Sequence, residues 1–159
     1  AGAVAVVAGT GLALQALVPA RSEQFDVVDY LAYPHCEQAD VSVLERVEPG
    51  RIMAPPWLGL QLMDQLPPGM TVASVSFHRA APGMRRTLQS FTSTDSQTRR
   101  AALEYSDYIA LCRLPVPDSV GTDTLFVVVA RGGDWPGLTR ISGADETFML
   151  FKIDHAALR

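Results

Sequence analysis

The chain has 159 residues, which is the length of one domain, or of one domain with an appendage. Its net charge of −4 and its 48% of hydrophobic residues exclude a nucleic-acid binder driven by bulk charge and a disordered chain. Two cysteines are too few for a small protein that is held together by disulfides.

Residues 1–20 contain no charged side chain and are rich in alanine and glycine. A helix of this length crosses the roughly 30 Å hydrocarbon core of a bilayer. We expect the last transmembrane helix of a larger membrane region, and a signal peptide or a buried soluble helix are the alternatives. After this segment Arg21 alone is basic and acidic residues soon follow, whereas a cytoplasmic flank is more often rich in Lys and Arg. We therefore expect residues 21–159 on the periplasmic or extracellular side of the cytoplasmic membrane.

Residues 21–35 are predicted to connect this helix to a globular domain of residues 36–155. A short helix or turn is expected at 41–47, where Pro49 and Gly50 end it. The apolar run 51–54 predicts a buried strand, and apolar residues at helical spacing predict a helix over 57–66.

The middle of the chain alternates in the same way. β-branched and aromatic residues predict a strand over 71–77, and residues 82–92 predict a loop with a short helix. Thr94 and Gln97 have the spacing of a capping box, which predicts that a helix starts at Thr94. A third buried strand is expected over 108–112.

The pattern at the end of the chain is less uniform. Residues 125–130 have strand propensity but lie between helix start and stop signals, so we favour a helix there. Strands are expected at 138–141 and 148–153, paired as a hairpin through a turn at 143–145. The alternation of strands and helices predicts an α/β fold with a mainly parallel sheet, flanking helices and a C-terminal β-hairpin, all preceded by the apolar transmembrane helix.

The two cysteines predict a disulfide between Cys36 and Cys112, because thiols outside the cytoplasm tend to pair. Two buried, unpaired thiols are the alternative. His35 and Cys36 are adjacent and face different ways, so we expect no metal site. Phosphate-binding, dinucleotide-binding and metalloprotease motifs are missing from the sequence, so we expect no cofactor and assign no catalytic residue.

His78 and Arg79 are the candidate ligand-binding pair. They follow the second predicted strand, and ligands of open α/β sheets bind at the carboxyl ends of strands. A histidine can transfer a proton, and the planar arginine fork can hold a carboxylate or phosphate. Purely structural hydrogen bonds are the alternative for both side chains.

Basic pairs and tryptophans offer further candidate contacts. The pairs Arg85–Arg86 and Arg99–Arg100 have the charge to touch anionic lipid or diphosphate groups near a bilayer, although such pairs are more often solvated helix faces. Trp57 and Trp135 have the rings to bind sugars or lie at the membrane interface. Packing in the core or in a turn is the more common role.

Several short segments occur in a characteristic order and spacing: Cys36, Gly50–Pro55, Leu58–Gly59, Phe77–Arg79, Asp107–Cys112 and Asp134–Leu138. This series resembles the C-terminal extracytoplasmic region of large bacterial polytopic membrane proteins that are similar to C-type glycosyltransferases, which use lipid-linked sugar donors. Two departures stand out. The family pattern has Tyr-His-Arg-Asn, where this chain has Phe77 to Ala80, and the turn around Trp135 differs too.

The resemblance implies an accessory domain of a membrane glycosyltransferase, because the catalytic acid of such enzymes is expected in a loop between early membrane helices that this chain does not contain. Such a domain would help to bind donor or acceptor, or stabilise the membrane part. Its implied partners are the lipid bilayer and a lipid-linked sugar or polysaccharide acceptor, with no nucleic acid. The alternative is a non-enzymatic periplasmic binding or scaffold module, either anchored in the membrane or secreted.

Overall fold

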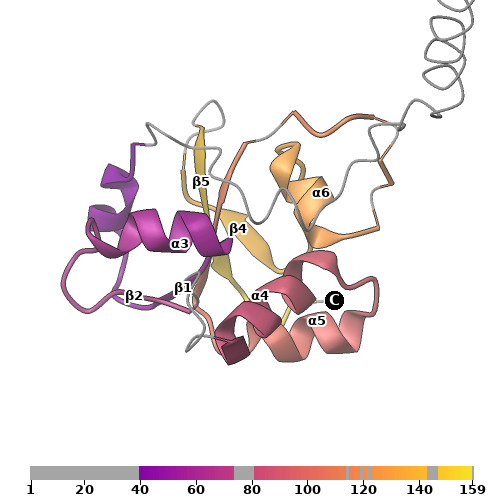
Figure 1. Cartoon of the computed structure of the whole chain (residues 1–159), viewed down its shortest axis with the longest axis horizontal. Helices are drawn as coiled ribbons and strands as arrows, with labels where there is room; N and C mark the ends of the chain where they lie inside the picture. Colours follow the sequence, from indigo (N-terminus) through magenta and orange to yellow (C-terminus); the bar gives the residue numbers. More distant parts are fainter. Residues whose placement is uncertain are drawn as a thin grey trace, which may run out of the picture.

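The computed structural model describes residues 40–73, 81–113, 115–118, 120–121, 123–142 and 147–158, which form one five-stranded sheet with helices against it (Figure 1). The predicted transmembrane helix 1–20 and connector 21–35 lie outside these residues, as does the start of the predicted domain 36–155. Among the described helices, none is both long and apolar enough to span a membrane.

The first described elements build one edge of the sheet. A 3-10 helix, η1 (Ser42–Arg46), buries Val43 and Leu44 and leads into strand β1 (Arg51–Met53). Helix α3 (Pro56–Met63) starts with a proline at its first position, where the missing N–H costs no hydrogen bond. The short strand β2 (Thr71–Val72) then pairs parallel with β1.

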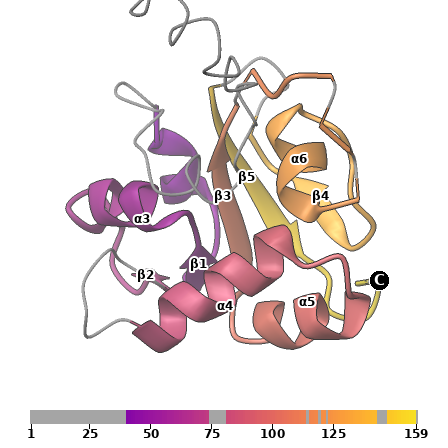
Figure 2. The same cartoon turned by 45° about the vertical axis from the view of Figure 1, so that its right-hand side comes forward.

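Helices α4 (Ala81–Thr92) and α5 (Ser96–Leu103) lie side by side (Figure 2). Residues 82–92 therefore belong to a full helix of 12 residues rather than to a loop with a short helix. The cap of α5 also differs from the expectation at Thr94. Asp95 is the N-cap, and its carboxylate accepts a hydrogen bond from the Thr98 backbone N–H at 2.7 Å. A carboxylate caps strongly, because it also interacts favourably with the positive end of the helix dipole.

Asp95→Ala is expected to lower the thermal stability of the chain at neutral pH. The hydrogen bonds from Thr98 hold the pKa of the Asp95 carboxyl below its ordinary value of 3.8. The stabilisation is thus fully present above pH 3.8 and is lost as the pH falls through the folded pKa. Melting curves from pH 2 to 7 should show the two proteins converging in acid. Thr94→Ala is the control; an equal loss of stability in that variant would contradict Asp95 as the cap.

Strand β3 (Tyr108–Cys112) is buried along its whole length, and helix α6 (Leu125–Ala130) follows it. The helical prediction for 125–130 is confirmed, despite its three consecutive valines. Five of the six residues of α6 are buried, so tertiary packing outweighs their strand propensity. Strands β4 (Leu138–Arg140) and β5 (Phe148–Ile153) complete the sheet and pair antiparallel, as the predicted hairpin requires.

The strand order is β2-β1-β3-β5-β4, and the prediction of a mainly parallel sheet is wrong. β1 pairs parallel with β2 and β3, but β5 pairs antiparallel with both β3 and β4 over longer ladders. β1, β2, β3 and β4 thus run one way, and β5 inserts against them. Burial explains the insertion. β5 buries five of its six residues and needs neighbours on both sides, whereas β4 is partly exposed and forms an edge.

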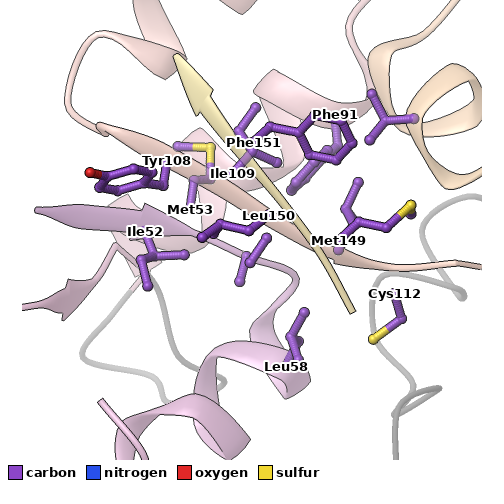
Figure 3. Close-up of a cluster of buried hydrophobic side chains, with 14 of the residues drawn as sticks. Ile52, Met53, Leu58, Phe91, Tyr108, Ile109, Cys112, Met149, Leu150 and Phe151 are labelled. Atoms are coloured by element: carbon purple, nitrogen blue, oxygen red, sulfur yellow. The ribbon is translucent and has the colours of Figure 1, made fainter. Parts of the chain in front are cut away.

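Helices cover both faces of the sheet. Ser90 of α4 places its Oγ 2.8 Å from Met53 Sδ, so Met53 faces α4. In Figure 3, Phe91 of α4 lies on the same side of the strands as Ile109 and Phe151, and Leu58 of α3 lies on the other side. This α/β arrangement of helices on a central sheet confirms the general class, but with a mixed sheet.

Candidate functional site

The residues predicted to bind a ligand, His78 and Arg79, lie outside the described residues. Cys36 does too. Cys112 is 6% exposed at the end of β3 and is not a free thiol. The pairing of Cys36 with Cys112 stays a prediction, because one of its two partners is not described.

A pocket of about 280 Å³ lies between the strands β1 and β2 and helix α4. It is lined by Arg51, Met53, Thr71, Val72, Ala73, Gly83, Arg86, Tyr105 and Ser106. Ala73 is the last described residue before segment 74–80, and α4 begins just after it, so the chain on both sides of the His78–Arg79 segment lines the pocket.

The pocket brings two arginines from distant parts of the sequence to one place. The guanidinium of Arg86 stacks 4.2 Å from the ring centroid of Tyr105. Arg51 donates from Nη1 to the backbone carbonyl of Tyr105 at 3.5 Å, a long and therefore weak hydrogen bond. Among the described residues, no carboxylate oxygen comes within 4.0 Å of either guanidinium group. The positive charge of this pocket is therefore not neutralised by an ion pair with the described part of the chain.

Ser106 contributes a hydroxyl group without a hydrogen-bond partner. Its side chain is 2% exposed, and Oγ has no hydrogen-bond partner among the residues that the structure describes. Its backbone is fixed, because the N–H donates to the Leu103 carbonyl at 3.0 Å. Most buried hydroxyl groups are hydrogen-bonded, so this exception calls for an explanation.

Asp107 follows Ser106 but has a structural task. Its Oδ2 accepts a hydrogen bond from the backbone N–H of Arg51 at 2.7 Å, and its own N–H donates to the Arg51 carbonyl at 2.8 Å. These two bonds fix the register between the start of β1 and the start of β3. Next to it, burial raises the pKa of the Tyr108 phenol, whose hydroxyl donates to the Glu48 carbonyl at 3.0 Å.

The two basic pairs are not simple solvated faces. In each pair one arginine is exposed and the other lies against an aromatic ring: Arg86 on Tyr105, and Arg99 on Trp135 at 4.7 Å from the ring centroid. Arg99 is 6% exposed, and burial lowers its pKa. This contact joins α5 to the turn before β4.

The two tryptophans differ in environment. Trp135 packs against the core beneath Arg99, which agrees with the packing role expected for it. Trp57 lies in the first turn of α3 and is 40% exposed. Trp57 is not part of the lining of the pocket between β1, β2 and α4, nor of a second pocket on α5.

A second, more open pocket of about 320 Å³ lies on α5 against the C-terminal turn. Its lining includes Arg100, Glu104 and His155, and Arg100 donates from Nη2 to the His155 carbonyl at 3.3 Å. Opposite charges are present together here, so this pocket has no net preference for an anion or a cation. Within the described ranges, no group of three or more His, Cys, Asp or Glu side chains is placed to hold a metal ion.

Sequence reasoning missed Arg51, Tyr105 and Ser106. Arg86 is one member of the basic pair Arg85–Arg86, but no sequence pattern connects it with Arg51, Tyr105 or Ser106. Residues 51, 86 and 106 are far apart in the chain, and only the parallel pairing of β1 with β3 and the position of α4 bring them together.

No protein-family model matches the chain, and no curated protein matches it. Among solved structures, the chain is similar to the C-terminal globular domain of an oligosaccharyltransferase from Archaeoglobus fulgidus, with 9% identity and a TM-score of 0.46. The similarity covers 79% of this chain and 93% of that chain. A similarity of this size supports no conclusion about the function or the site.

Proposed function

We propose that this chain is an accessory extracytoplasmic domain of a membrane glycosyltransferase-like protein. The domain helps to bind a lipid-linked sugar donor or an acceptor, or stabilises the membrane part. Residues 1–20 anchor it as a transmembrane helix, and residues 21–159 lie on the outer side of the cytoplasmic membrane. The sequence resemblance of the segments between Cys36 and Leu138 motivates this proposal.

In the structure, several of these resembling segments make contacts that position strands and turns. Gly50 precedes β1 at a point of close approach, because a Cβ there would come within 2.9 Å of both Asp107 Oδ2 and Tyr108 Cε2. Asp107 in turn accepts the hydrogen bond from Arg51 that aligns β1 with β3. The segments Gly50–Pro55 and Asp107–Cys112 thus contact each other, and the bond between Arg51 and Asp107 fixes the pairing of β1 with β3.

The last resembling segment is also structural. Gly137 has φ = 84° in the turn before β4, and its carbonyl accepts a hydrogen bond from Asp154 N–H at 2.8 Å. Trp135 packs beneath Arg99 in the same turn.

The single observation that carries the proposal is that three segments of the resembling series, Gly50–Pro55, Asp107–Cys112 and Asp134–Leu138, hold strands and turns in place. A series of scaffold residues is what an accessory domain needs, whereas a catalytic domain would share residues that converge on a reacting group. His78 and Arg79, in the remaining segment of the series, are the residues that we propose contact donor or acceptor.

Glycosyl transfer by the intact membrane protein tests this proposal. We expect His78→Ala and Arg79→Ala to raise the apparent KM for the lipid-linked donor or the acceptor at least about tenfold, because hydrogen bonds to charged groups contribute roughly 1.5–3 kcal/mol. kcat should change less. Arg85→Ala, which removes an exposed arginine, is the control. Unchanged kinetics in both variants, with folding retained, would contradict the ligand-binding role.

The location and the alternative function need a second measurement. Labelling of whole cells with a membrane-impermeant reagent should modify residues 21–159, and a reaction only after lysis would contradict the proposed topology. The coding sequence upstream of Ala1 separates the two functions. Several hydrophobic spans with an acidic loop residue support the glycosyltransferase-like protein, and a start codon with a short basic leader supports the secreted binding module.

A further inference from the structure

We propose that the pocket between β1, β2 and α4 binds a phosphate group, held by the guanidinium groups of Arg51 and Arg86 and by the hydroxyl of Ser106. This inference concerns the pocket alone and does not depend on the proposed function. Figure 2 shows α4 passing in front of β1 and β2. Residues of all three elements line the pocket.

The size of the pocket favours a small ligand or the end of a larger one. Its volume of about 280 Å³ lies at the lower limit for small-molecule sites. Its lining is more polar than that of most ligand pockets, since Arg51, Arg86 and Ser106 stand beside the apolar Met53 and Val72, and a lining of this kind suits a charged ligand.

The charges of the pocket favour an anion. Arg86 uses the face of its guanidinium on Tyr105, which leaves the N–H groups at the edge of that plane for other acceptors. Arg51 donates one N–H in a weak hydrogen bond to the Tyr105 carbonyl. Its other side-chain N–H groups make no hydrogen bond to the described parts of the chain. Asp107 and Glu104 are not part of the lining, and Asp107 keeps its Oδ2 on the backbone N–H of Arg51. The two arginines, Arg51 and Arg86, form no ion pair with a described carboxylate, so their two positive charges suit a ligand with two negative charges.

Ser106 is the second and independent observation. A buried hydroxyl without a partner is unfavourable, and a ligand oxygen in the pocket would remove that cost. Thr71 adds a further hydroxyl to the same lining. The donors come from a strand, a helix and the turn before β3. Donors from several directions suit a tetrahedral oxyanion, whereas a planar carboxylate is satisfied by one arginine fork.

The test is a titration of the 159-residue chain with inorganic phosphate, monitored by the backbone amide shift of Ser106 in NMR spectra. We expect a saturable shift with millimolar affinity. Arg51→Gln and Arg86→Gln should each weaken binding at least tenfold. Arg85→Gln removes the same charge from an exposed position on α4 and should leave the affinity within twofold. The proposal fails if phosphate causes no saturable shift, or if Arg85→Gln weakens binding as much as Arg86→Gln.

Ser106→Ala keeps the proposal testable without loss of a charge. Because Oγ has no partner, this variant should melt at the same or a higher temperature than the original chain when no phosphate is present. It should bind phosphate several-fold more weakly, and phosphate should therefore raise its melting temperature less. If phosphate raised the melting temperature of Ser106→Ala as much as that of the original chain, Ser106 would not contact the phosphate and the proposal would be wrong.

Two further titrations identify the source of the phosphate. One uses glucose 1-phosphate, and the other uses vesicles that contain phosphatidylglycerol. A shift of Ser106 with the soluble ester supports a free phosphorylated ligand, and a shift with vesicles supports a lipid head group. Both responses must be lost in Arg51→Gln. A vesicle response that survives this substitution would contradict the assigned pocket.

Discussion

Gly137→Ala is expected to destabilise the domain by about 2–5 kcal/mol, which is a large part of the roughly 5–15 kcal/mol that holds a typical domain together. Gly137 has φ = 84°, a left-handed conformation that costs an L-residue about 1–2 kcal/mol. A Cβ there would also lie 2.7 Å from the Leu158 backbone N and 2.8 Å from its Cα. Backbone atoms cannot rotate away, so the C-terminal turn must shift, and overpacking of this kind costs about 1–3 kcal/mol.

Two other glycines separate these contributions. Gly132 has φ = 83°, but a Cβ there would meet the tip of the Arg113 side chain, which can move aside. Gly132→Ala should therefore cost about 1–2 kcal/mol, from the conformation alone. Gly121→Ala has neither problem, since its nearest contact is 3.4 Å, and should be close to neutral. Urea denaturation measures all three. Equal costs of Gly137→Ala and Gly132→Ala would contradict the contact with the Leu158 backbone.

Phe91→Ala is expected to cost about 3–5 kcal/mol, because it removes a large side chain from the centre of the core. Phe91 is completely buried, and its ring meets that of Phe126 edge-on, with centroids 6.2 Å apart and an angle of 83°. This contact joins α4 to α6. The cavity should also loosen the position of α4, whose Arg86 lines the proposed phosphate pocket.

The cost of the cavity is distinguished from the cost of the ring contact by Phe91→Leu. Leucine retains most of the buried volume and loses mainly the edge-to-face contact, worth about 0.5–1.5 kcal/mol. Met63→Ala removes a side chain that is 50% exposed and should stay within about 0.5 kcal/mol of the original chain. Denaturant unfolding that ranks the three substitutions in any other order would contradict the position of Phe91 in the core.

Local patterns predicted the elements wherever burial and periodicity agreed. The bounds of β3 and β5 are those expected, since continuous apolar runs between proline, glycine and polar signals leave few alternatives. The bounds of α6 are also those expected, but there the start and stop signals favoured a helix against the strand propensity of three valines. α4 was underestimated because its sequence begins with Ala81-Pro82-Gly83, which indicates a loop when no tertiary contact is known. The N-cap of α5 is Asp95, one residue after the predicted Thr94, because threonine and aspartate are both favoured N-cap residues.

The order of strands could not be predicted from alternation alone. The rule that alternating strands and helices form a parallel sheet describes β1, β2 and β3, but it does not say where a final strand inserts. The apolar run of β5 and the partly exposed β4 carried a usable signal, since the more buried strand of a terminal pair belongs in the interior of the sheet.

The candidate ligand-binding residues also divide into those that local sequence patterns indicate and those that only the tertiary structure brings together. The sequence singled out His78 and Arg79 by their position after a strand, and this stays a prediction. The basic pair also indicated Arg86, but no sequence pattern connects Arg86 with Arg51 or Ser106.

What the sequence by itself determined is local: the apolar first segment, the positions of most strands and helices, and the turns that glycine and proline require. Only the tertiary structure decided the antiparallel insertion of β5, the stacking of Arg86 and Arg99 on aromatic rings, and the pocket of two arginines around Ser106. The physical reason is the range of the interactions. Propensity and periodicity act over a few residues, whereas strand pairing and the burial of a charged or polar group depend on partners tens of residues away.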